Sequence, residues 1–153
     1  MCHRLLFGVS LLVALTVAAV PAARGGPNLT ATVEMDVEYG ETEALVTFNI
    51  VFKNTGDAWC DASIWWADFW GMYTCQCDTN PMFCQTAPAA SKTWDFPDPE
   101  VLGPNMSLAV PPFVLSYPYS PEPYKFMLFV DSLFSCNEGG QESDNFICGE
   151  FII

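Results

Sequence analysis

Two apolar, aromatic-rich runs near the end of the chain most constrain its fold. Tyr124–Asp131 and Phe146–Ile153 have the length of strands, and the polar segment between them contains Gly139, Gly140 and Asn145. Strand-length runs separated by turn residues predict a β-hairpin with a loop longer than a tight turn. Both runs are too apolar to face water on two sides, so the hairpin must belong to a larger sheet.

Two earlier segments alternate between apolar and polar residues. In Ala31–Tyr39 the acids Glu34, Asp36 and Glu38 occupy every second position, and Ala44–Lys53 follows after a turn at Gly40. A period of two with acids on one side predicts half-buried strands. The residues expected to face the core are Val33, Met35, Val37, Tyr39, Val46, Phe48, Ile50 and Phe52.

Further strands are predicted between these segments and the terminal hairpin. Ser63–Trp70 places Trp65 and Trp66 on opposite faces, so one of them should lie in the core. Ser107–Tyr117 is interrupted by Pro111 and Pro112, which predicts an edge position or a bulge. The segment 71–99 contains three cysteines and several prolines, and we expect a long disulfide-stapled loop there. Short strands punctuated by turns predict an all-β sandwich.

The first 23 residues have the pattern of a secretory signal peptide. A short basic start precedes the apolar run Leu5–Val20, and small residues follow at Ala22 and Ala23. The alternative is a membrane anchor, but the run is short for a span. We therefore expect residues 1–23 to be removed, the mature chain to be secreted or otherwise extracytoplasmic, and no membrane span to remain in it.

Export changes the meaning of the cysteines. Cys2 would be lost with the signal peptide, and an even number in an oxidising compartment predicts three disulfides. The six that remain are Cys60, Cys75, Cys77, Cys84, Cys136 and Cys148. In a sandwich, Cys60 and the terminal hairpin loop would share one end, so we predict that Cys60 pairs with Cys136 or Cys148. A thiolate metal site at Cys75, Cys77 and Cys84 is the alternative.

Charge and histidine content exclude several functions. The mature chain would keep all 18 acidic residues and four basic ones, which gives a net charge of −14. A chain this acidic repels nucleic acid. His3 would also be lost, and without histidine there is no Ser-His-Asp or Cys-His nucleophilic site. We expect no enzymatic activity. Glycosidase chemistry by paired carboxylates is the weaker alternative.

Several short motifs resemble those of the CARDB family, the cell-adhesion-related domain found in bacteria. They are Asn54-Thr55-Gly56 after the second strand, Leu102-Gly103 before a middle strand, and Val130-Asp131 with Glu142 and Asn145 at the end. The resemblance covers about Pro27 to Ile153. It implies an immunoglobulin-like sandwich of about seven strands and a surface or secreted adhesion or binding module without catalytic residues. The six cysteines and the long segment 71–99 depart from the family.

Acidic residues gather around the terminal loop. Asp131, Glu138, Glu142 and Asp144 supply carboxylates there, and oxygen-rich loops bind calcium. Their spacing does not match a twelve-residue calcium loop, and such residues also shape turns for conformational reasons. Calcium is the one cofactor that we consider.

Aromatic residues give the sharpest sign of binding. Trp and Tyr offer large rigid contact areas to sugars and protein partners, although they also fill cores. The crowded residues are Trp59, Trp65, Trp66, Trp70, Tyr73 and Trp94. Trp59, Trp70 and Trp94 are the candidate ligand-binding residues. The partner would be a protein or glycan at the cell surface, and a carbohydrate-binding module is the alternative function.

Two glycosylation sequons are present, Asn28-Leu29-Thr30 and Asn105-Met106-Ser107. The resemblance to a bacterial family gives them little weight.

Overall fold

The computed structural model of the chain describes residues 25–60, 64–72, 89–97, 102–139 and 145–153. Eight strands form among these residues. They are β1 (Leu29–Tyr39), β2 (Glu43–Asn54), β3 (Trp65–Met72), β4 (Ala89–Phe96), β5 (Ser107–Ala109), β6 (Phe113–Pro118), β7 (Tyr124–Val130) and β8 (Phe146–Phe151).

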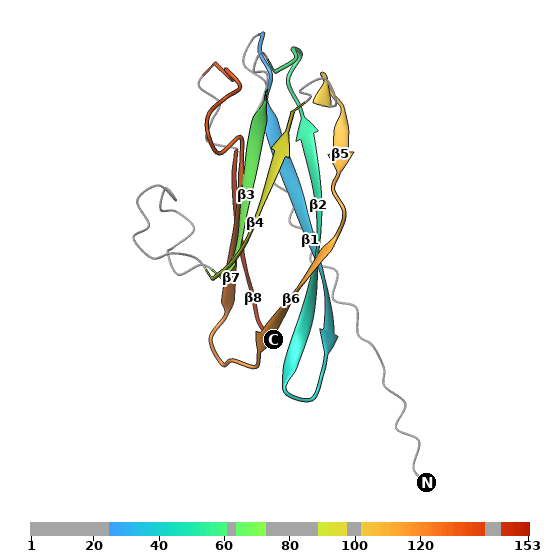
Figure 1. Cartoon of the computed structure of the whole chain (residues 1–153), viewed down its shortest axis with the longest axis vertical. Coiled ribbons are helices and arrows are strands. Elements are labelled where there is room, and N and C mark those ends of the chain that lie inside the picture. The colour runs from blue at the N-terminus through green and yellow to red at the C-terminus, as the bar shows by residue number, and fades with distance from the viewer. Residues whose placement is uncertain (1–24, 61–63, 73–88, 98–101, 140–144) are drawn as a thin grey trace.

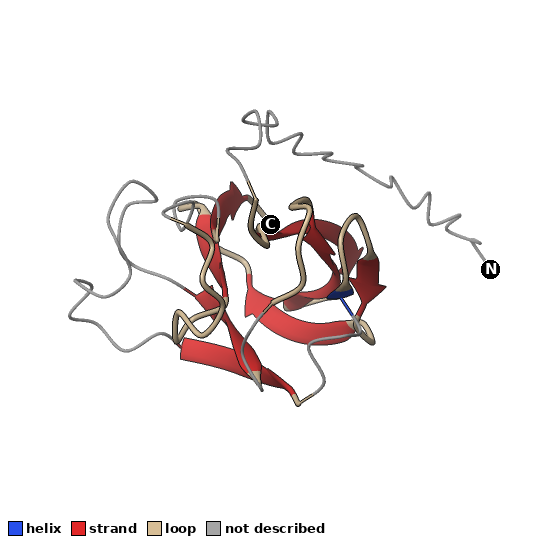
Figure 2. Cartoon of the chain, turned by 90° about the horizontal axis from the view of Figure 1, so that it is seen from above, coloured by secondary structure: helices blue, strands red, loops and turns tan. Residues whose placement is uncertain are grey.

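The strands form two antiparallel sheets packed face to face (Figures 1 and 2). In the first sheet, β1 pairs with β2, and β2 pairs on its other side with β5 and β6. The second sheet has the order β4-β3-β7-β8. The chain changes sheet between β2 and β3, and β7 returns beside β3, as in immunoglobulin folds. The predicted all-β sandwich is confirmed.

The period-two pattern correctly identified the inward faces of β1 and β2 except at Tyr39, which was expected in the core but lies at the end of β1 and is 58% exposed. Val46, Phe48, Ile50 and Phe52 are buried between the sheets, whereas the acids of β1 face outward. Phe48 meets Phe69 of the opposite sheet edge-on, with ring centroids 4.8 Å apart. This contact and its neighbours join the two layers into one core.

The two adjacent tryptophans of β3 separate as predicted. Trp65 is fully buried and stacks on Phe96 with 3.9 Å between ring centroids, while its edge meets Phe52 at 5.6 Å. Trp66 lies on the outer face and is partly exposed. The core tryptophan on the third strand is therefore Trp65.

The prediction of a loop throughout 71–99 was wrong at both ends. β3 continues to Met72, and Ala89–Phe96 forms β4, paired with β3 from Trp65↔Phe96 to Met72↔Ala89. Alanine, serine and lysine have weak strand preference, so pairing with β3 and burial of Phe96 determine this strand. Residues 73–88 lie outside the described part of the chain.

Proline and lysine mark the neighbouring edges of the two sheets. Pro111 and Pro112 separate β5 from β6, which confirms the predicted interruption at an edge. On β4, Lys92 places its ammonium 5.7 Å from the centre of the Trp94 ring and 5.4 Å from that of Phe113. An inward-pointing charge on an edge strand opposes pairing with another chain.

A buried tyrosine connects the two sheets. Tyr117 of β6 is fully buried and donates a hydrogen bond of 2.9 Å to the carbonyl of Gly71. Burial raises the pKa of the Tyr117 phenol well above its usual value, and the nearby Tyr124 adds to the rise.

Candidate functional site

Four segments meet where β2 and β7 end and β1 begins, at the top of Figure 1. They are residues 25–28, 55–60, 102–106 and 131–139, and we call them together the loop end. Loops held by a rigid scaffold are where binding residues concentrate. The loop end is therefore the part of the sandwich best suited to hold a binding site.

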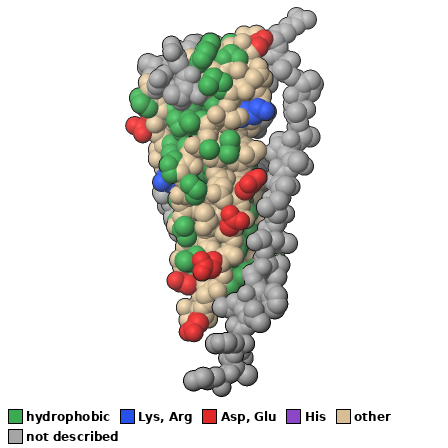
Figure 3. Space-filling view, turned by 90° about the vertical axis from the view of Figure 1, so that its right-hand side faces the viewer, with side chains coloured by type: hydrophobic (Ala, Val, Ile, Leu, Met, Phe, Trp, Pro, Cys, Tyr) green, Lys and Arg blue, Asp and Glu red, His purple; other side chains and the backbone are tan. Residues whose placement is uncertain are grey.

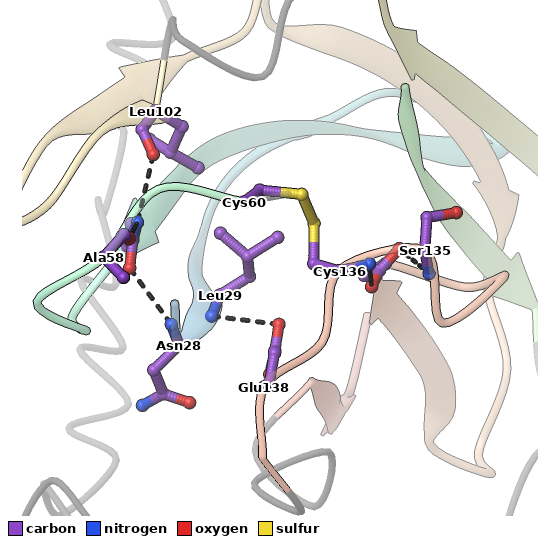
Figure 4. Close-up of a disulfide and its surroundings, with 10 residues drawn as sticks. Asn28, Leu29, Ala58, Cys60, Leu102, Ser135, Cys136 and Glu138 are labelled. Carbon is purple, nitrogen blue, oxygen red and sulfur yellow. Dashed lines mark hydrogen bonds between the residues drawn. A yellow bond between two sulfur atoms is a disulfide. The ribbon is translucent and has the colours of Figure 1, made fainter. Parts of the chain in front are cut away.

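A disulfide joins two of these segments. Cys60, six residues after β2, is bonded to Cys136, six residues after β7, and both are buried (Figure 4). This confirms the predicted pairing of Cys60, with Cys136 as the partner. Cys148 on β8 is also disulfide-bonded. Cys75, Cys77 and Cys84, on which the expected disulfide stapling of the segment 71–99 depends, lie outside the described residues.

Asn54, the last residue of β2, connects three segments through its side chain. Its Oδ1 accepts hydrogen bonds from the backbone N–H groups of Asn28 and Gly56, at 3.1 and 2.9 Å. Its Nδ2 donates to the carbonyls of Ala58 and Leu102, at 2.9 and 3.1 Å. Asn54 is fully buried, and these four bonds use the full capacity of an asparagine amide.

Sequence reasoning missed this role of Asn54. The Asn54-Thr55-Gly56 turn was visible, and a glycine two residues after asparagine is a signal for a side-chain-capped turn. Gly56 is required for a second reason: a Cβ there would lie 2.6 Å from the Asn28 nitrogen and would also collide with the carbonyl oxygen of Gly26. The backbone of 26–28 thus passes directly over this turn.

Two of the predicted calcium ligands hold backbone amides. The Asp131 carboxylate accepts hydrogen bonds from the N–H groups of Ser135 and Cys136, at 2.9 and 2.7 Å. The backbone of Asp131 has a φ of 50°, at the start of a tight turn. Glu138 accepts from the N–H of Leu29 at 3.2 Å (Figure 4). Both carboxylates are buried. In the structure they shape the loop end and attach it to β1.

Glu142 and Asp144, the other two predicted calcium ligands, lie outside the described residues. Within the described ranges, no three histidine, cysteine or acidic side chains gather closely enough to hold a metal ion. The calcium site therefore stays an untested prediction.

The loop end exposes four large apolar side chains in two pairs. Trp59 is 50% exposed and rests its six-membered ring on Gly103, while Met106, 46% exposed, donates its backbone N–H to the Gly103 carbonyl. In the segment 131–139, Leu133 and Phe134 are 62% and 45% exposed. Phe134 and Asp131 lie in the same turn, which is closed by a hydrogen bond of 2.8 Å from the Phe134 N–H to the Asp131 carbonyl.

The other two candidate binding tryptophans lie on the sheets. Trp94 faces the core and contacts Phe52 and Phe113 edge-on, with centroids 5.8 and 5.7 Å away. Trp70 lies partly buried on the outer face of β3, where it is paired with Met127. Only Trp59 among the three belongs to the loop end, so the structure does not bring the predicted tryptophans together.

Charge is distributed unevenly over the sandwich. The outward positions Glu34, Asp36 and Glu38 of β1, with Glu43 of β2, make the first sheet acidic away from the loop end. Figure 3 shows acidic side chains gathered over the lower half of this side of the molecule.

Comparison with known proteins gives no match: no family model, curated protein or solved structure corresponds to this chain. Among the residues described, none forms an apolar helix of the length that a membrane span requires.

Proposed function

We propose that this protein is an extracytoplasmic, non-catalytic binding module of the adhesion type that contacts a protein partner through its loop end. The observation that carries the proposal is the exposure of Trp59, Met106, Leu133 and Phe134 on loops that the Cys60–Cys136 disulfide and the Asn54 hydrogen bonds hold in place. Aromatic and methionine side chains are enriched at protein interfaces. Their exposure on a prefixed surface lowers the ordering cost of binding.

Export is supported by the signal-peptide pattern and by the disulfide, which persists in oxidising compartments. The resemblance to the CARDB family supports the adhesion class, and membership of that family is part of the proposal. The acidic outer surface of the first sheet favours a partner whose contact region lacks strong negative charge.

Carbohydrate binding is the second candidate, and Trp59 favours it. Half of its surface is exposed, and one aromatic platform suffices to stack on a sugar ring. In this case Trp59 alone would dominate binding, and the Leu133–Phe134 pair would contribute little.

The test is saturable binding of the labelled, oxidised mature protein to intact cells of the producing organism. Cells are pretreated with protease or with glycosidases, and binding is repeated with calcium and with chelator. We expect binding to be lost after protease treatment of the cells and to be unchanged after glycosidase treatment. Loss after glycosidase treatment alone, together with binding to a purified polysaccharide panel, would transfer the protein to the carbohydrate class.

Val114→Thr provides the matched control. Val114 is exposed on β6, outside the loop end, and threonine keeps its β-branched shape. This variant should bind like the wild type, whereas Trp59→Ala and Phe134→Ala should each weaken binding. Absence of saturable binding to treated and untreated cells alike would contradict the proposed function.

A further inference from the structure

The two glycosylation sequons occupy opposite environments in the folded chain. Asn28 is only 8% exposed, and its Nδ2 donates a hydrogen bond of 2.7 Å to the Thr55 hydroxyl. Its backbone carbonyl accepts from the Thr55 N–H at 2.8 Å. A glycan on this Nδ2 would have to pass through the packed contact between residues 26–28 and the turn after β2. The fold therefore requires Asn28 to be unmodified.

Asn105 has the features of an acceptor. It is exposed, and it lies in the turn Gly103–Met106, which is closed by a hydrogen bond of 2.9 Å from the Met106 N–H to the Gly103 carbonyl. Its φ of 61° is the left-handed conformation that asparagine adopts more readily than most residues. Ser107, the hydroxyl residue of the sequon, is also exposed at the start of β5.

We propose that, in a secretory pathway that attaches N-linked glycans, Asn105 is glycosylated and Asn28 is not. In the transfer, the Nδ2 of Asn105 attacks C1 of a lipid-linked oligosaccharide diphosphate. A C–N bond forms, the bond between C1 and the phosphate oxygen breaks, the amide loses one proton, and the lipid diphosphate leaves. The product is a bulky, hydrophilic surface modification, which the exposed turn accommodates.

This inference depends on export and on a source cell that attaches N-linked glycans, and it is independent of which partner the loop end binds. It does affect how binding is measured, because Asn105 adjoins Met106 and the Gly103 turn that supports Trp59. A glycan there would stand beside the Trp59–Met106 pair. Binding should therefore be compared between glycosylated protein and the Ser107→Ala variant, which lacks the Asn105 sequon.

The experiment is secretion of the full chain from a eukaryotic cell line, followed by digestion with peptide N-glycosidase in heavy-oxygen water and peptide mass spectrometry. The enzyme converts a glycosylated asparagine to labelled aspartate. Conversion is expected at Asn105 and not at Asn28. Two matched variants remove one sequon each while keeping its asparagine: Ser107→Ala should abolish the electrophoretic shift on digestion, and Thr30→Val should leave it unchanged.

Label at Asn28 in the secreted protein, a shift that persists in Ser107→Ala, or a shift lost in Thr30→Val would overturn the proposal. So would a secreted protein without glycan from cells that glycosylate a reference protein in the same culture. Asn105→Gln is a second variant that should also abolish the shift, and it covers the case in which Ser107→Ala is secreted poorly.

Discussion

Replacing Asn54 by alanine tests whether its side chain organises the loop end. The change removes four hydrogen bonds, to the N–H groups of Asn28 and Gly56 and to the carbonyls of Ala58 and Leu102. Each bond contributes about 1 kcal/mol net, and buried groups left without partners cost about 1–3 kcal/mol. Because Ala58 is partly accessible to water, we expect the free energy of unfolding to fall by about 3–4 kcal/mol.

The assay is equilibrium unfolding in urea under oxidising conditions, followed by tryptophan fluorescence, with wild type and variants compared at one temperature. Asn49→Ala is the matched control, because Asn49 makes one exposed hydrogen bond, to Asp36. It should cost less than about 0.5 kcal/mol. Asn54→Asp keeps an acceptor for the two amides but faces two carbonyl oxygens without a donor, so at neutral pH it should be destabilised like Asn54→Ala.

The reasoning is refuted if Asn54→Ala loses less than about 1 kcal/mol, the contribution of a single hydrogen bond. A loss equal to that of Asn49→Ala would show that water replaces all four partners. A large loss for Asn54→Ala with no loss for Asn54→Asp would show that the two donated bonds are unimportant.

Three further changes test other parts of the structure. Replacing Cys60 and Cys136 together by alanine removes a cross-link between residues 76 apart in sequence. The free energy of unfolding should fall by up to about 4.5 kcal/mol in the same urea titration, and an unchanged midpoint would show that the disulfide does not stabilise the fold. Gly56→Ala forces a Cβ against the backbone of residues 26–28 and should cost about 1–3 kcal/mol, and a neutral effect would mean that this segment moves freely. The raised pKa of Tyr117 means that the folded state holds the phenol proton more tightly than the unfolded state, so this stabilisation is complete below about pH 10 and is lost as pH rises further. Stability at high pH should therefore fall less steeply in Tyr117→Phe, and identical slopes would contradict this.

Much of the fold follows from local pattern. Alternation in β1 and β2 fixed their inward faces, because a shift by one residue would expose every apolar side chain of the pair. The doubled proline predicted the break between β5 and β6, because proline cannot donate to the ladder. The sequence did not predict β4, because its Ala-Ala-Ser-Lys start has little strand preference of its own. Its existence depends on β3, a contact that local sequence does not encode.

The candidate site was less predictable. Residue chemistry drew attention to Asp131 and Glu138 as metal ligands, but the topology brings backbone amides to both carboxylates. Trp94 looked like a platform in the sequence, and only the pairing of β4 shows that it faces the core. Asn54 passed as an ordinary turn residue, because two of its four partners, Asn28 and Leu102, are distant in sequence.

The most direct test of the proposed binding surface is the dissociation constant of the labelled mature protein on intact producing cells, measured for wild type, Trp59→Ala/Phe134→Ala and Val114→Thr. Unfolding midpoints of all three are measured alongside, to show that each protein is folded. Loss of two interface anchors should raise the dissociation constant at least about thirtyfold, the equivalent of about 2 kcal/mol, while Val114→Thr binds like wild type. An unchanged constant in the folded double variant would show that the partner binds elsewhere on the sandwich.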